Sequence, residues 1–207
     1  MIRLLLAAML GFSVFLFIGF VLSSHPDHQA SKHVENWGGP RGMHLYLCAV
    51  HLAKDDSKFQ VVAHHYCGAH GNKVHQCVVY DSRGENAKLL GVEYIISQET
   101  YVSLPEDEKK YWHPHDYEID SGQLVAPDEA DDGDSLLQGL RTTWGKTWHT
   151  WRDPKTALPF GEPRLMWSAT ADGQVNPELI ITRDREFGIE SQKIGERRRQ
   201  AAIRVKP

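Results

Sequence analysis

The sequence predicts an α+β fold: a single compact domain with a mostly antiparallel sheet and packed helices, behind an N-terminal hydrophobic helix. First, residues 59–67 and 74–80 alternate between two sets of side chains on either side of a short Gly/Asn loop, as in a β-hairpin. Second, Ser103-Leu-Pro and Asn176-Pro place a capping side chain before an early proline, which predicts helix starts. Third, the run Leu4–Leu22 carries no charge over 19 residues.

Composition places the chain among globular proteins. Its 207 residues suffice for one domain with a substantial core plus appended segments, and 10% are aromatic and 24% charged. The net charge of −4 argues against a general nucleic-acid binder, which normally presents a basic surface. Histidine is unusually frequent. Nine of the 12 histidines lie between His44 and His149, so the fold itself contains them.

Residues 1–24 are predicted to be a signal peptide or a transmembrane anchor. Arg3 precedes the apolar run and small residues near Ser23 offer a cleavage point, as in a signal peptide. The run is also nearly long enough to cross a bilayer, which takes about 20 apolar residues. With either interpretation residues 25–40 form a polar tether. The remainder is then membrane-anchored or secreted, on the extracytoplasmic, periplasmic-type side.

The cysteines Cys48, Cys67 and Cys77 show no CxxC spacing, so the usual zinc-ribbon and redox motifs are absent. Cys67 and Cys77 flank the hairpin loop and would face each other across it. An oxidising compartment favours a Cys67–Cys77 bridge, with Cys48 buried and free. The alternative is that all three are small core residues.

The first element after the tether is Gly42–Ala53, which is apolar on nearly every side and predicts a buried helix with His44 and His51 along one stripe. The hairpin follows, and residues 87–97 form a third strand in which Gly91 marks a bulge. Caps and alternation predict the later elements: a short helix from Ser103, a strand at 123–126, a helix at 135–144, a strand at 146–151, a last strand at 165–170, a helix from Asn176 and a basic helix from Ser191 to Arg204.

Residues 108–118 combine histidines, carboxylates and aromatic rings around a proline. Pro114 favours extended backbone at His113, so we expect the imidazoles of His113 and His115 to point the same way. Imidazoles and carboxylates bind zinc and other transition metals, which suggests a metal site, with Asp116 or Glu118 as base if it is hydrolytic. The candidate ligands are His64, His65, His113, His115, His149 and Glu118. The same histidines can also be ordinary core residues packed against tryptophan.

A second hypothesis is a small-ligand pocket without chemistry. Ligand pockets are usually lined by apolar and aromatic side chains with few polar groups. The candidate lining residues are Tyr66, Trp112, Trp148 and Trp151.

Several motifs together resemble a known family. They are His44-x-Tyr46-Leu47-x-x-x-His51, His64-His65-Tyr66-Cys67, residues 76–82 (QCVVYDS), residues 86–96 (NAKLLGVEYII), Tyr111-Trp112-His113-Pro114-His115 and Gly145-Lys146-Thr147-Trp148-His149-Thr150-Trp151. Over roughly residues 40–190 the chain is similar to the oil-body-associated proteins, which are built on a domain of unknown function.

The resemblance implies a compact α+β domain at residues 41–190 and a link to lipid, because the plant members are found with seed lipid droplets. It carries over no catalytic activity and no catalytic residue. The hydrophobic N-terminus departs from the plant members and suggests a bacterial-type exported relative.

The leading hypothesis is an exported or membrane-anchored, non-enzymatic domain that acts at a membrane or lipid surface, with no nucleic-acid partner. It rests on the apolar N-terminal run, the resemblance and the basic segment 191–207, which either contacts lipid headgroups or is a solvated helical face. The metal site, with zinc as the first candidate ion, and the aromatic pocket are the alternatives. The oligomeric state is left open. If several histidines are buried and neutral, we also expect stability to fall below about pH 6.

Overall fold

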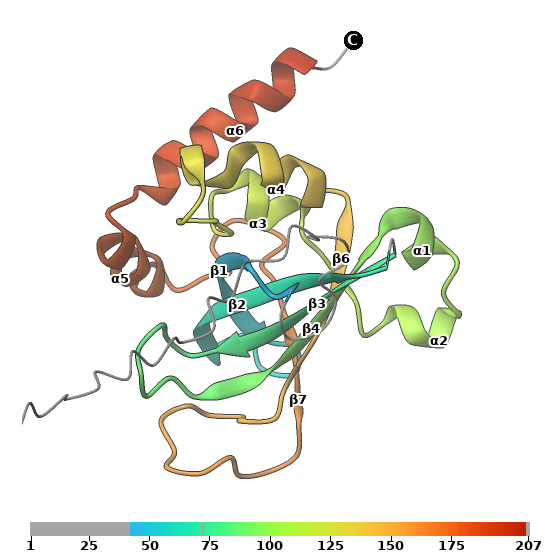
Figure 1. The fold of residues 1–207 in the computed structure, drawn as a ribbon, viewed down its shortest axis with the longest axis vertical. Helices are drawn as coiled ribbons and strands as arrows, with labels where there is room; N and C mark the ends of the chain where they lie inside the picture. Colours follow the sequence, from blue (N-terminus) through green and yellow to red (C-terminus); the bar gives the residue numbers. More distant parts are fainter. Residues whose placement is uncertain (1–41, 72, 206–207) are drawn as a thin grey trace, which may run out of the picture. The chain divides into compact units, whose positions relative to one another are not determined.

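Six antiparallel strands close into a barrel (Figure 1). In the computed structural model, which describes residues 42–71 and 73–205, these strands are β1 (Leu45–Ala53), β2 (Gln60–His70), β3 (Val74–Tyr80), β4 (Leu89–Ser97), β6 (Thr143–His149) and β7 (Arg164–Trp167). Neighbouring strands follow the order β4-β3-β2-β1-β7-β6, and β6 pairs in turn with β4. The two-residue strand β5 (His113–Pro114) is attached to β6.

The predicted antiparallel sheet with packed helices is therefore confirmed, and its closure into a barrel is a further finding. The predicted hairpin is β2 and β3, and its predicted Cys67–Cys77 disulfide is formed, with Cys48 free and buried. The predicted signal peptide or anchor (1–24) and the predicted tether (25–40) lie outside the described residues.

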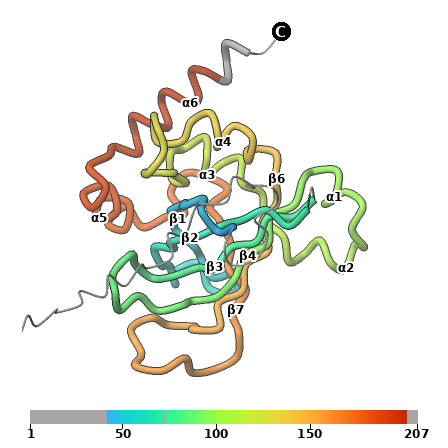
Figure 2. The backbone as a smooth tube through the Cα atoms, in the orientation of Figure 1, coloured from blue at the N-terminus to red at the C-terminus, as the bar shows by residue number. Residues whose placement is uncertain are grey.

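Most helices lie together on one side of the strands, as Figures 1 and 2 show. There α6 (Ser191–Val205), drawn red, runs beside α3 (Asp116–Asp120) and α4 (Asp134–Leu140). The remaining helical segments are α1 (Gln98–Val102), α2 (Glu106–Lys109), the 3-10 turn Ala130–Gly133 and α5 (Pro177–Phe187). Within the described residues, none of these helices has both the length and the apolar character needed to cross a bilayer.

The inward-facing side chains of the strands form two apolar clusters. One contains Leu47, Ala49, Cys67, Cys77 and Ile95, joined by residues of α3, α4 and the segments beside them. The other contains Ala53, Val61, Ala63, Val79, Leu90 and Met166. On three of the strands a polar residue separates the two clusters: His51 on β1, His65 on β2 and Glu93 on β4. A polar layer therefore lies between two apolar ones.

The structure corrects the prediction of a buried helix at Gly42–Ala53, because this segment contains the strand β1. Eight of the nine β1 residues are buried, since the inward face meets the barrel core and the outward face lies in a third cluster with Val125 and Ile194 of α6. A strand buried on both faces is apolar on every side, so its pattern is the same as that of a buried helix.

Smaller differences concern where elements begin and end. The predicted helix 135–144 stops at Leu140, and Thr143 already belongs to β6. The segment after His113–Pro114 is not extended, because Asp116 begins α3. Residues 123–126 contribute only the single bridge of Val125 to Cys48. The helix α1, capped by the Ser97 hydroxyl, was not predicted.

Candidate metal centre

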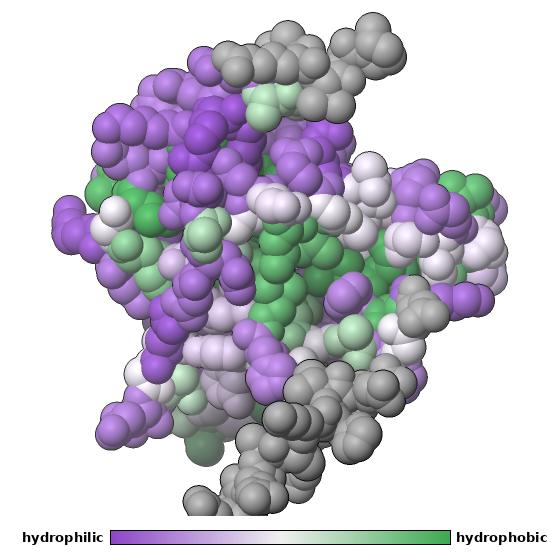
Figure 3. All heavy atoms as spheres, turned by 45° about the horizontal axis from the view of Figure 1, so that its top comes forward, coloured by the Kyte–Doolittle hydropathy of each residue, from purple (hydrophilic) through white to green (hydrophobic). Residues whose placement is uncertain are grey.

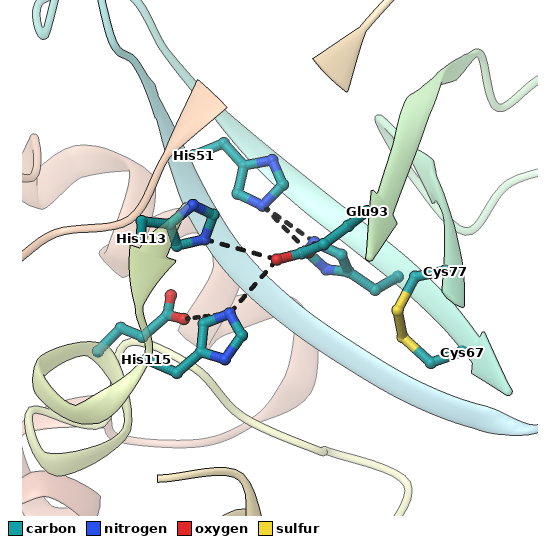
Figure 4. The surroundings of a disulfide bond; sticks show 8 residues. His51, Cys67, Cys77, Glu93, His113 and His115 are labelled. Atoms are coloured by element: carbon teal, nitrogen blue, oxygen red, sulfur yellow. Dashed lines mark hydrogen bonds and ion pairs between the residues drawn. A yellow bond between two sulfur atoms is a disulfide. The ribbon is translucent and has the colours of Figure 1, made fainter. Parts of the chain in front are cut away.

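Glu93 lies at the centre of the polar layer, on the middle of β4, and its side chain is almost completely buried. Four imidazole Nε2 atoms approach its carboxylate (Figure 4). His115 and His113 lie 3.3 and 3.5 Å from Oε1. His65 and His51 lie 3.0 and 4.0 Å from Oε2. All four imidazoles are buried, so the cluster is an interior feature of the barrel.

Local backbone geometry explains why His113 and His115 meet at Oε1. Strand β5 pairs with β6 through His113 and Gly145, and α3 begins immediately after His115. Gly145 allows the close approach: a Cβ there would lie 2.6 Å from His115 Nε2, 2.8 Å from His113 Nε2 and closer still to Glu93 Oε1. Only glycine can occupy this position without displacing the donors.

A hydrogen-bond chain fixes the tautomer of His115. The Thr143 hydroxyl donates its single hydrogen to the Leu140 carbonyl, at 2.6 Å. His115 Nδ1 lies 2.8 Å from the same hydroxyl oxygen, so Nδ1 must be the donor of that bond. In a neutral imidazole this leaves a lone pair on Nε2, which points at Glu93 Oε1. Two electron-rich atoms that face each other at 3.3 Å are stabilised by a cation between them.

Electrostatics favours the protonation states that metal binding requires at three of the donors, His51, His113 and Glu93. Burial lowers the pKa of His51 well below its usual value, and the neighbouring imidazoles of His65 and His149 add to the effect. Burial also lowers the pKa of His113, although Glu93 opposes it. For Glu93, burial would raise the pKa, but the imidazoles of His113, His115 and His65, which lie at hydrogen-bonding distance, outweigh it and hold the pKa well below the usual range. Metals bind neutral imidazoles and ionised carboxylates.

Two predicted ligands lie at the edge of the cluster. Glu118 Oε1 is 3.9 Å from His115 Nε2, and burial, followed by the charges of Glu93 and Asp116, raises its pKa well above the usual value. His149 Nε2 is 3.0 Å from His51 Nδ1, on the side of that ring away from Glu93. Burial lowers the His149 pKa to about 3, so this imidazole is neutral. It is placed to orient His51.

The space at the cluster is small. A cavity of about 10 Å³ is lined by His51, His65, Glu93, His115, Glu118 and five apolar residues. Roughly this volume accommodates one water molecule.

The structure brings together His65, His113 and His115 from the predicted set, and it places His149 and Glu118 beside them. It does not bring His64 to the cluster. His64 lies on the opposite face of β2, where Nδ1 is 2.7 Å from the Tyr46 hydroxyl. Consecutive strand residues point to opposite faces, so only one of the pair His64-His65 can face inward.

Two central residues, Glu93 and His51, were absent from the predicted ligands. Glu93 is the one carboxylate inside an otherwise apolar strand and shares an inward face with Ile95, which is the signal that identifies it. His51 was assigned to a helix, whereas strand alternation places it with Ala49 and Ala53. Asp116, a predicted base, is exposed and accepts a hydrogen bond from the Tyr117 amide.

The four predicted pocket aromatics have different surroundings. Lys146 lies over the Tyr111 and Trp112 rings, and Tyr111 contacts Trp148. Tyr66 contacts Tyr46 and Tyr80 on the outer face of β2. Trp151 packs against the second apolar cluster. Tyr66 and Trp151 therefore have surroundings separate from those that Trp112 and Trp148 share through Tyr111 and Lys146.

In the basic segment, Arg197 and Arg199 lie on an exposed face, as predicted, whereas Arg198 does not. Arg198 is buried and bonds Asp134 together with the carbonyls of Ile119 and Leu124. Arg197 bonds Asp134, and Arg199 bonds the Asp120 carbonyl. These cations hold α6 against the rest of the domain.

Comparison with known proteins identifies the family. The family model described as "Protein of unknown function (DUF1264)" matches residues 39–202. Oil body-associated protein 1B of Arabidopsis thaliana is 36% identical over 166 residues, which cover 77% of this chain and 67% of that protein. Oil body-associated proteins 1A and 2A of Zea mays are each 39% identical, over 75% and 72% of this chain and 66% and 61% of their own lengths.

The chain thus spans about two thirds of the length of these curated relatives. No solved structure matches it. The match to the family model over most of the chain and the identity to these relatives agree, and the protein therefore belongs to the DUF1264 family of proteins of unknown function, with plant oil-body-associated proteins as its homologues.

Proposed function

We propose that this protein binds a transition metal ion through Glu93 and the imidazoles that surround it. The observation that carries the proposal is the approach of four buried imidazole Nε2 atoms to the Glu93 carboxylate, with the His115 ring held by Thr143 so that its Nε2 faces Oε1. Donors held at zinc–ligand distances of about 2.0–2.2 Å in a tetrahedron lie about 3.3–3.6 Å apart. His115 and His113 lie 3.3 and 3.5 Å from Glu93 Oε1.

The donor set supports an ion that accepts nitrogen and oxygen ligands, with zinc as the first candidate and iron, nickel or copper as others. The small cavity and the burial of every donor favour a firmly held ion over the hydrolysis of a large substrate. The proposed role is therefore to hold the metal inside the barrel. Any chemistry there is limited to molecules about the size of water.

Elemental analysis of the full chain, purified without chelators, tests this proposal. We expect at least one equivalent of metal per chain in the wild type and its loss in Glu93→Gln. His65→Gln and His64→Gln form a matched pair, because both residues are buried on β2 but only His65 faces Glu93. The first should lower metal content and the second should not. Less than roughly 0.1 equivalent in the wild type, with no Zn²⁺ uptake in calorimetry, would exclude a metal role.

Association with a lipid surface is the second candidate. The relatives are named as oil body-associated proteins, and β4 exposes Leu89, Val92 and Tyr94, which are 45%, 36% and 41% accessible. Val92 pairs with Val78 on one side and with Trp148 on the other. On the face drawn in Figure 3, hydrophobic side chains gather in the middle with hydrophilic ones around them. Contiguous exposed apolar surface is typical of membrane and protein contacts.

Flotation with triacylglycerol emulsions tests the lipid candidate, using the chain without residues 1–24 so that the apolar run does not contribute. Val92→Glu with Tyr94→Glu should reduce the bound fraction. Ile181→Glu is the control, because Ile181 on α5 is 47% exposed but lies outside the sheet. Equal binding of all three proteins would argue against docking through β4.

We also propose that the domain is exported, through the signal peptide or anchor predicted at residues 1–24. The Cys67–Cys77 disulfide supports an oxidising compartment. Alkylation of intact cells followed by mass spectrometry should find this pair oxidised and Cys48 reduced. Free thiols at Cys67 and Cys77 would contradict export.

A further inference from the structure

We propose that the Glu93 cluster is a dinuclear centre in which the Glu93 carboxylate bridges two metal ions. The inference rests on the metal-binding function proposed above and adds the number of ions and their arrangement.

The donors divide into two sets that share only Glu93. One set is Glu93 with His113 and His115, and the other is Glu93 with His51 and His65. Within each set the three donor atoms lie within 4.8 Å of one another. The first set meets Oε1, as the dashed lines from His113 and His115 in Figure 4 show, and the second set meets Oε2. A carboxylate has two oxygens that can bind separate ions, and ions in two-metal sites lie about 3.5–4 Å apart.

The second set has the same need for a cation as the first. His65 Nε2 lies 2.9 Å from His51 Nε2 and 3.0 Å from Glu93 Oε2. A neutral His65 has one hydrogen. If the hydrogen is on Nε2, it must be shared between His51 Nε2 and Glu93 Oε2. If it is on Nδ1, it has no acceptor, because His65 Nδ1 is buried without a hydrogen-bond partner. An ion among the three atoms satisfies all of them at once.

The two sets are supported in parallel ways. In each set one imidazole is held from behind by another side chain: His115 by Thr143 and His51 by His149. Such outer contacts orient metal-bound histidines. The other imidazole of each set, His113 or His65, has a buried Nδ1 with no partner.

The surroundings supply further ligands. Glu118 adds a second carboxylate, 3.9 Å from His115 Nε2. The cavity of about 10 Å³, lined by both glutamates and by donors of both sets, has room for one water-sized ligand beside the donors. Each ion has three protein donors, and these groups would fill coordination positions that those donors leave vacant.

Metal stoichiometry separates this inference from the function on which it rests. Native mass spectrometry and elemental analysis of the zinc-loaded full chain should give two ions per chain. One ion would overturn the dinuclear centre and leave metal binding intact, and none would overturn both. This wild-type measurement does not depend on any variant folding.

Variants that remove one set identify the bridge. His65→Gln and His113→Gln should each bind one ion, Glu93→Gln should bind neither tightly, and His64→Gln should still bind two. Circular dichroism spectra of all four should match the wild type. With Mn²⁺, the wild type should show a spin-coupled electron paramagnetic resonance spectrum and the single-site variants an uncoupled one. A wild-type spectrum equal to the sum of the two single-site spectra would overturn bridging by Glu93.

Discussion

Gly145 shows how one missing side chain makes room for the donors. A Cβ atom at this position would lie among the side chains of Glu93, His113 and His115. Gly145→Ala should therefore lower metal content although every donor remains, and overpacking should destabilise the fold by about 1–3 kcal/mol. Metal analysis and chemical denaturation measure the two effects.

Gly139→Ala provides the matched control, because a Cβ at this exposed position on α4 meets nothing within 4 Å. It should stabilise the helix by about 0.5–1 kcal/mol and leave metal content unchanged. Unchanged metal binding in Gly145→Ala would show that the donors do not depend on this close approach.

The buried histidines make stability depend on pH. Burial, followed by the neighbouring His65 imidazole and the charge of Arg83, lowers the pKa of His64 to about 4, although Asp81 opposes the shift. Burial lowers that of His149 to about 3. Both groups are neutral in the fold, while in the unfolded chain they bind protons below about pH 6.5. Stability is thus fully present above that pH and falls as pH decreases toward the folded-state values.

In this pH window, each such histidine should make the free energy of unfolding change by up to about 1.4 kcal/mol per pH unit. Melting temperatures of the metal-free protein between pH 8 and pH 4.5 measure it. The melting temperature should decrease below pH 6.5, and the decrease should be smaller in His64→Gln. A constant melting temperature would contradict burial of neutral imidazoles.

At the scale of elements, α6 is held by a buried cation and not by apolar packing alone. Arg198 donates to the carbonyls of Ile119, Leu124 and Asp132 and bonds Asp134. Arg198→Met should destabilise the fold by about 3–5 kcal/mol, because these groups lose a buried partner. Arg199→Met, on the exposed side, should cost less than about 1 kcal/mol. Urea denaturation of the two variants makes the comparison, and equal losses would argue against this role of Arg198.

The hairpin of β2 and β3 is cross-linked at its directly paired residues Cys67 and Cys77. Replacing both by alanine should lower the free energy of unfolding by about 2–4 kcal/mol. Reducing agent should lower the melting temperature of the wild type similarly and leave the double variant unaffected. If the reductant lowers the melting temperatures of the wild type and the double variant equally, its effect does not come from this disulfide.

For the whole molecule, a polar layer between two apolar clusters is costly unless its groups are paired. A bound ion supplies the partner, so metal should stabilise the entire barrel. At a free-metal concentration 100 times Kd the gain is about 2.7 kcal/mol. Differential scanning fluorimetry should show a lower melting temperature after chelation and recovery on adding Zn²⁺. The Glu93→Gln variant should respond to neither treatment.

The sequence alone determined the features that depend on neighbouring residues. These are the β2–β3 hairpin, with Cys67 and Cys77 placed to face each other across it, the Asn176 cap of α5 and the basic helix α6. Each depends on turn chemistry, capping or the two-residue period of extended backbone, which act over a few residues.

Only the tertiary structure decided which faces meet. The alternation of side chains along a strand predicts that His64 and His65 point to opposite faces. Only the core contacts of β2 decide that His65 is the one that faces inward. Burial on both faces makes β1 a strand despite its helix-like apolar pattern. The pairings of β6 with β4 and β5 bring Glu93 beside Gly145, His113 and His115, residues far apart in the chain. Such long-range pairing depends on the packing of the whole barrel, and no local pattern encodes it.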